Sequence, residues 1–66
     1  MPEVNLKAIK KRRMELGITQ KEMANALNLS FAEKYARREN GIYKFQVEEL
    51  PLLAKTLQIP LEKIYY

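Results

Sequence analysis

The 66-residue chain is predicted to be an all-α domain of five short helices. Three observations predict this fold class. Apolar residues recur at spacings of three and four, and the period-two alternation of an exposed strand is absent. Residues that cap helix starts precede these segments, and glycine or asparagine follows them. With no cysteine and no histidine, the helices must be held by their own packing or by pairing with another chain.

The first two helices have well-marked ends. Asn5 is a plausible cap for the first helix, and Gly17 stands where a left-handed residue would end it. In the second helix, Thr19 and Glu22 have the spacing of a capping box, in which each side chain satisfies a backbone donor of the other. Asn28 ends this helix because asparagine tolerates the left-handed conformation of a tight turn.

The stretch NLSFAEKYARRENG holds the third predicted helix. Ser30 and Glu33 form a second capping-box pattern at its start, and Gly41 ends it. So short a turn after the second helix favours a steep crossing, as in a helix-turn-helix over about residues 19–40. This unit belongs to a single predicted domain that covers residues 1–66.

The last two helices are predicted from proline positions and apolar spacing. Pro51 lies near the first turn of the fourth helix, where a missing N–H costs least, and Val47 is assigned to the apolar side of this helix. Pro60 is assigned to the first position of the fifth helix.

Composition and charge limit the possible functions. Twelve Lys/Arg against eight Asp/Glu give a net charge of +4, which favours a polyanionic partner. The apolar runs are too short for a membrane span or a signal peptide, so a cytoplasmic location is expected. The run KAIKKRR is interpreted as a solvated helix face. Without histidine, cysteine or a glycine-rich loop, catalysis is rejected, and no metal, cofactor or small-molecule ligand is indicated.

From Leu6 to Tyr65 the sequence resembles the lambda-repressor-like (Cro/CI, XRE-type) helix-turn-helix family. The resemblance is carried by IKKRRMELGITQKEMANALNLS, ENG and VEELPLLAKTLQIPLEKI at matching distances. It implies a compact five-helix fold and sequence-specific binding of double-stranded DNA, with the third helix in the major groove. It also implies a transcriptional regulator, usually a repressor and often a homodimer, and a dimer is expected to bind a roughly palindromic operator.

The resemblance assigns roles to individual residues. Arg13 and Glu39 match a structural salt bridge between the first helix and the end of the third. Gln20 matches a glutamine that grips a DNA phosphate together with free N–H groups at a helix start, which agrees with the positive end of the helix dipole. The expected phosphate contacts are Thr19, Gln20, Arg38, Asn40, Tyr43 and Lys44.

The sequence departs from the family pattern inside the third helix. Eight residues separate Ser30 from Glu39, where the family commonly has seven, and one residue turns a helix by about 100°. Counting back from Glu39 places Tyr35 in the core, whereas counting from Ser30 places Lys34 there, and a core favours the tyrosine. Phe31 is then absorbed in a longer turn or wedged inward. The base contacts expected from this count are Ala32, Glu33, Lys34, Ala36 and Arg37.

A second function remains open: a helical protein-interaction module, such as the antitoxin of a toxin–antitoxin pair. The C-terminal segment with Leu61, Ile64, Tyr65 and Tyr66 has more apolar surface than so small a domain is expected to cover. The sequence therefore predicts a dimer interface there.

Overall fold

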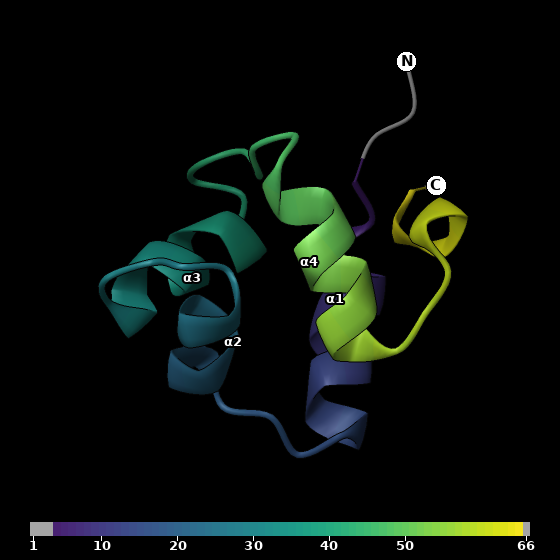
Figure 1. Cartoon of the computed structure of the whole chain (residues 1–66), viewed down its shortest axis with the longest axis horizontal. Helices are drawn as coiled ribbons and strands as arrows, with labels where there is room; N and C mark the ends of the chain where they lie inside the picture. The colour runs from purple at the N-terminus through teal and green to yellow at the C-terminus, as the bar shows by residue number, and fades with distance from the viewer. Residues whose placement is uncertain (1–3, 66) are drawn as a thin grey trace.

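The computed structural model describes residues 4–65, which fold into four α-helices and one 3-10 helix (Figure 1). In chain order they are α1 (Leu6–Glu15), α2 (Gln20–Ala26), α3 (Ala32–Glu39), α4 (Glu49–Leu57) and η1 (Leu61–Ile64). Across this described part of the chain, the β pairing is limited to an isolated bridge between Val4 and Tyr65. The all-α class is confirmed.

The prediction of a fifth α-helix is wrong, because residues 61–64 form a 3-10 turn. Pro60, predicted as the first helical residue, is the N-cap instead, with a ψ of 146°. Tyr65 is already extended and pairs with Val4. Only four residues lie between these two fixed points, so a second turn cannot form to offset the cost of starting an α-helix.

The predicted caps of α1 and α2 are confirmed. Asn5 Oδ1 accepts a hydrogen bond from the backbone N of Ala8 at 3.2 Å. Thr19 Oγ1 accepts from the backbone N of Glu22 at 3.1 Å, and Glu22 Oε1 accepts from the backbone N of Thr19 at 2.9 Å. The hydrogen bond from the Thr19 N–H stabilises the ionised carboxylate and lowers the pKa of Glu22 below its ordinary value.

Every α-helix of the described chain ends in the same motif. A left-handed residue follows its last turn, with φ between 57° and 82° at Gly17, Asn28, Gly41 and Gln58. After Asn28, the N–H of Leu29 reaches back to the carbonyl of Ala24 at 2.8 Å, which is the longer bond of a Schellman motif. The endings at glycine and asparagine follow from the sequence, whereas the left-handed Gln58 is unexpected.

The start of α4 differs from the prediction. Val47 lies in the turn before the helix and is 81% exposed, so its assignment to the apolar side of α4 is wrong. Pro51 explains the later start. If the helix included Val47, the carbonyl of Val47 would need an N–H from Pro51, which proline lacks.

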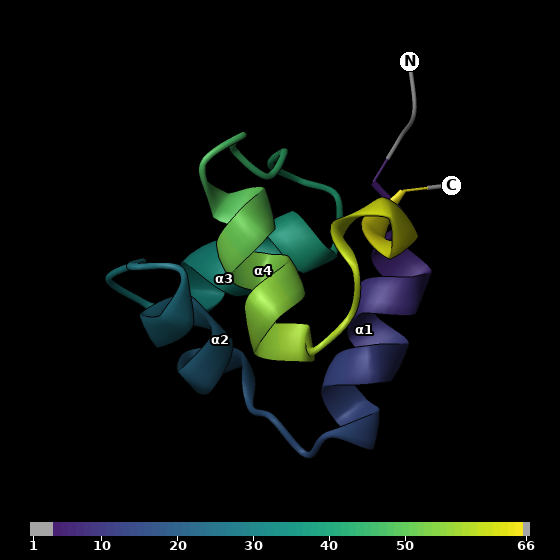
Figure 2. The ribbon, with the colours of Figure 1, turned by 45° about the vertical axis from the view of Figure 1, so that its right-hand side comes forward.

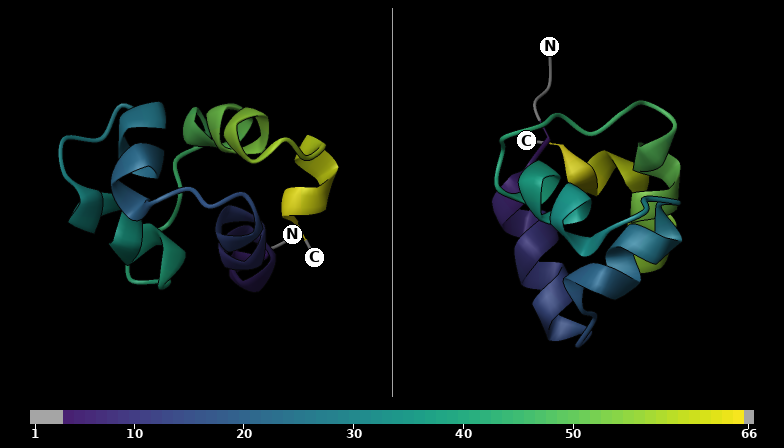
Figure 3. Two further views of the ribbon diagram at one scale, coloured as in Figure 1. Left: turned by 90° about the horizontal axis from the view of Figure 1, so that it is seen from below. Right: turned by 90° about the vertical axis from the view of Figure 1, so that its left-hand side faces the viewer.

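A single apolar core joins all five elements. Figure 2 shows α4 between the α2–α3 pair and α1, with η1 over the N-terminal end of α1. Seen from below, the α2–α3 pair lies at one end of the molecule and η1 at the other (Figure 3). In residues 4–65, no helix has the length and apolar character to cross a membrane. The buried apolar residues are Ile9, Met23, Ala24, Leu27, Tyr35, Leu53, Ala54, Leu57 and Ile64.

Candidate nucleic-acid interface

Helix α3 has one buried face and one exposed face. Tyr35 is fully buried and Glu39 is 4% exposed, whereas Glu33, Lys34 and Arg37 are exposed. The Tyr35 ring packs edge-to-face on Phe45, with 6.1 Å between ring centroids. The phase of the helix is therefore the one counted back from Glu39, and it leaves three charged side chains on the outward face.

The capping box predicted at Ser30 is wrong. Helix α3 begins at Ala32, its N-cap is Phe31 in an extended conformation, and no side chain caps it. Phe31 is 61% exposed, so the extra residue is absorbed in the turn and not wedged inward. A cap contributes about 1 kcal/mol, and burying a large aromatic side chain such as Tyr35 contributes more. The burial of Tyr35 thus sets the rotational phase of α3, and the helix begins without a side-chain cap.

Arg13 and Glu39 join α1 to the end of α3 through two hydrogen bonds. Arg13 Nε donates to Glu39 Oε2 at 2.8 Å, and Arg13 Nη2 donates to Oε1 at 3.1 Å. Burial alone would raise the pKa of Glu39, but the hydrogen bonds and charge of Arg13 outweigh it and lower that pKa. Arg13 Nη1 also donates to the carbonyl of Ile18 at 2.8 Å, which holds the segment leading into α2.

A second ion pair joins α3 to α4. Arg38 Nε donates to Glu49 Oε1 at 2.9 Å, and Arg38 Nη1 donates to the carbonyl of Lys34 at 2.9 Å. Glu49 Oε1 also accepts from the backbone N of Gln46, so the carboxylate holds the loop before α4. The side chains of Arg38 and Glu49 are only 14% and 8% exposed. Arg38, expected at a phosphate, is thus engaged inside the domain.

The other expected phosphate contacts lie at the start of α2 and after α3. Thr19 Oγ1 accepts a bond at the capping box, which leaves its own proton free to donate. Gln20 is half-buried as the first residue of α2. Asn40, Tyr43 and Lys44 are exposed in the segment that follows α3.

This arrangement of α2 and α3 matches a known family. A family model described as helix-turn-helix matches residues 9–64, most of the chain. The chain belongs to the XRE-type, lambda-repressor-like helix-turn-helix family. Comparisons with curated proteins and with solved structures found no match. In this helix-turn-helix domain, α2 is the first helix of the motif and α3 is the second.

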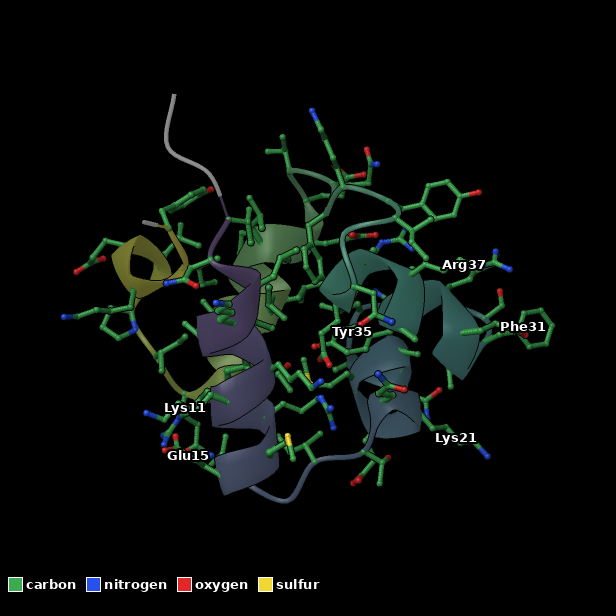
Figure 4. All side chains as sticks on the ribbon, turned by 180° about the vertical axis from the view of Figure 1, so that it is seen from behind. Lys11, Glu15, Lys21, Phe31, Tyr35 and Arg37 are labelled. Carbon is green, nitrogen blue, oxygen red and sulfur yellow. The ribbon has the colours of Figure 1, made fainter. Side chains whose placement is uncertain are left out.

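Two residues that the sequence interpretation missed belong to the outward side of the helix-turn-helix. Lys21 on α2 and Phe31 before α3 project to the same side as Arg37 (Figure 4). Lys34 Nζ lies 6.0 Å from the centroid of the Phe31 ring. The Arg37 guanidinium lies 6.0 Å from the centroid of the Tyr43 ring. Each cation of the α3 face therefore has an aromatic ring beside it.

The C-terminal segment contributes less exposed apolar surface than predicted. Ile64 is fully buried in the domain's own core, and Tyr65 is partly buried against it. The backbone N of Asn5 donates to the carbonyl of Ile64 at 2.6 Å and ties the two ends of the described chain together. Leu61 stays 42% exposed, and Tyr66 lies outside the described residues. Of the four residues assigned to a dimer interface at this end, Ile64 is thus used inside the domain.

Proposed function

We propose that the protein is a cytoplasmic transcriptional repressor that binds double-stranded DNA at a specific sequence, with α3 in the major groove. The observation that supports this most is the division of α3 into two faces. Tyr35 and Glu39 hold the helix to the domain, and Glu33, Lys34 and Arg37 are left on the outward face. The second helix of a helix-turn-helix is the element that enters the major groove in proteins built this way.

The outward face of α3 has the chemistry to distinguish base pairs. Lys34 and Arg37 can donate to the O6 and N7 atoms of guanine, and Glu33 can accept from the amino group of cytosine. The half-buried Ala32 and Ala36 present methyl groups that can contact thymine. We assign the base contacts to these five residues.

The proposed phosphate contacts flank this face and set the position of the domain on the duplex. The Glu22 carboxylate is held by the backbone N–H of Thr19 at the start of α2, and the neighbouring Lys21 is exposed. Arg38 is left out of the set because its guanidinium already donates to Glu49 and to the carbonyl of Lys34. The remaining candidates are Thr19, Gln20, Asn40, Tyr43 and Lys44.

We propose a homodimer on a palindromic operator. The two recognition helices would then meet half-sites about 34 Å apart along the duplex, one helical turn. Sedimentation at increasing protein concentration tests this assembly. A monomer at all concentrations, both free and on the operator, would contradict it.

Selection of bound sequences from random duplex DNA tests the proposed function. We expect a recovered palindrome whose affinity falls steeply as salt rises, because each phosphate contact releases counterions. A salt-dependent affinity without sequence enrichment would refute specific recognition. The absence of duplex binding would instead favour the protein-interaction module.

A further inference from the structure

The exposed Phe31 ring lies on the candidate reading surface and has no function in the core. It is 61% exposed, although burying a phenylalanine side chain would stabilise the domain by about 1.5–3 kcal/mol. A single exposed apolar residue is common and means little by itself. Phe31 differs because it directly precedes α3 and points to the same side as Arg37 (Figure 4). Its position on this side of the domain, rather than its exposure alone, indicates a function.

The ring is also coupled to one of the cations of α3. Lys34 Nζ lies 6.0 Å from its centroid, and the backbone N of Lys34 donates to the carbonyl of Phe31 at 3.1 Å. Because Phe31 has an extended backbone at the N-cap, its ring continues the outward face of α3 past the N-terminal end of the helix. An apolar surface and an ammonium group therefore face the same part of any ligand on this side.

In the major groove, the apolar feature that distinguishes one base from another is the C5-methyl group of thymine. The same methyl group occurs on 5-methylcytosine. We propose that Phe31 is a specificity-determining residue that contacts the C5-methyl group of a pyrimidine, beside the base pair that Lys34 reaches. In unmodified DNA this pyrimidine is a thymine. The inference rests on the proposed function and adds a base preference that the charged residues of α3 do not provide.

Deoxyuridine provides a direct test because it pairs like thymine and lacks only the methyl group. In the operator recovered by selection, each thymine is replaced in turn by deoxyuridine, and the Kd is measured by fluorescence anisotropy. Besides any thymine that Ala32 or Ala36 contacts, we expect a thymine in each half-site whose replacement weakens binding of the unaltered protein about 4-fold, the equivalent of ~0.8 kcal/mol for one buried methyl group. For Phe31→Ala, binding should be weaker overall and indifferent to deoxyuridine at that position.

Two variants control this experiment. Val47→Ala also shortens an exposed apolar side chain, but Val47 lies in the turn before α4, so it should keep the full sensitivity to the methyl group. Phe31→Leu retains an apolar side chain and should keep part of the sensitivity to the methyl group. A thermal melt of each variant should match the unaltered protein, because both sites are exposed.

The outcomes separate this inference from the proposed function. An operator with 5-methylcytosine·guanine in place of the identified T·A pair should bind more tightly than one with cytosine·guanine there. This difference in Kd should vanish in Phe31→Ala. A half-site without thymine, a flat deoxyuridine series, or equal sensitivity in Phe31→Ala would overturn the role of Phe31 while duplex recognition stands. Absence of binding to any duplex would overturn both.

Discussion

Removing the positive partner of the Arg13–Glu39 pair should destabilise the domain strongly. The Glu39 side chain is 1% exposed, and Arg13 donates two hydrogen bonds to its carboxylate. In Arg13→Met the carboxylate stays buried without its counter-charge, and breaking such a pair costs about 3–5 kcal/mol. A chain of 66 residues has a total stability on the order of 3–10 kcal/mol, so much of the variant should be unfolded at neutral pH.

The pH dependence of this loss tests its cause. In the unaltered protein the pKa of Glu39 is lowered, so its contribution to stability is present above the pKa of the unfolded chain. That contribution is lost as the pH falls through the folded value. In Arg13→Met, burial without the guanidinium should raise this pKa, so the folded state binds a proton more readily than the unfolded chain. The difference in stability between the two proteins should therefore shrink from pH 7 to about pH 4.

Urea unfolding followed by helical circular dichroism measures both effects. The double variant Arg13→Met with Glu39→Leu removes both charges and should recover most of the loss. About 1 kcal/mol should stay lost, because the carbonyl of Ile18 no longer receives the hydrogen bond from Arg13. A loss in Arg13→Met that is the same at both pH values, or that the double variant shares in full, would refute this account of the pair.

Three further predictions follow from other contacts. Arg37→Ala should weaken DNA binding by about 1–3 kcal/mol at one base pair and relax specificity there, whereas Lys44→Ala should weaken the binding of all duplexes alike. An equal loss of affinity for every duplex in Arg37→Ala would contradict its base contact. Tyr35→Phe should change the free energy of urea unfolding by less than ~1 kcal/mol, because the buried Tyr35 hydroxyl makes no well-formed hydrogen bond in the described chain, although it lies beside Glu39 and Arg13. A larger loss would show that the hydroxyl donates to Glu39. Glu49→Ala should cost about 2–3 kcal/mol in urea unfolding, below the full cost of a buried pair because Arg38 keeps some exposure; no loss would show that the pair is not stabilising.

Local rules were sufficient where no packing requirement competes with them, whereas the same capping rule failed at Ser30. The cap at Asn5, the reciprocal bonds of Thr19 and Glu22, and the left-handed Gly17 each follow from the residue type and its immediate neighbours. The buried position of Tyr35 followed from a single comparison with Lys34 as a core residue. Features of this kind are decided within about one helical turn, so the sequence pattern alone predicts them.

The sequence was insufficient where a long side chain chooses among distant partners. Arg38 pairs with Glu49 eleven residues away, and Arg12 Nε donates to the carbonyl of Leu57 forty-five residues away at 2.9 Å. The charge of Arg38 predicted a phosphate contact, because a flexible cation on a helix can reach solvent as well as a partner inside the domain. Only the packing of α4 against α1 and α3 decides between these alternatives.

The extra residue before α3 shows how the competing requirements are settled. An insertion inside a helix would rotate every later side chain by about 100°, and the buried Tyr35 and Glu39 would leave their partners. A turn absorbs the same residue at the cost of one side-chain cap, about 1 kcal/mol. The outward face of α3 therefore keeps the phase set by the buried Tyr35, and Phe31 lies in front of it. Because the core fixes the phase of the helix, a change in the length of this turn alters the surface available for recognition without altering the fold.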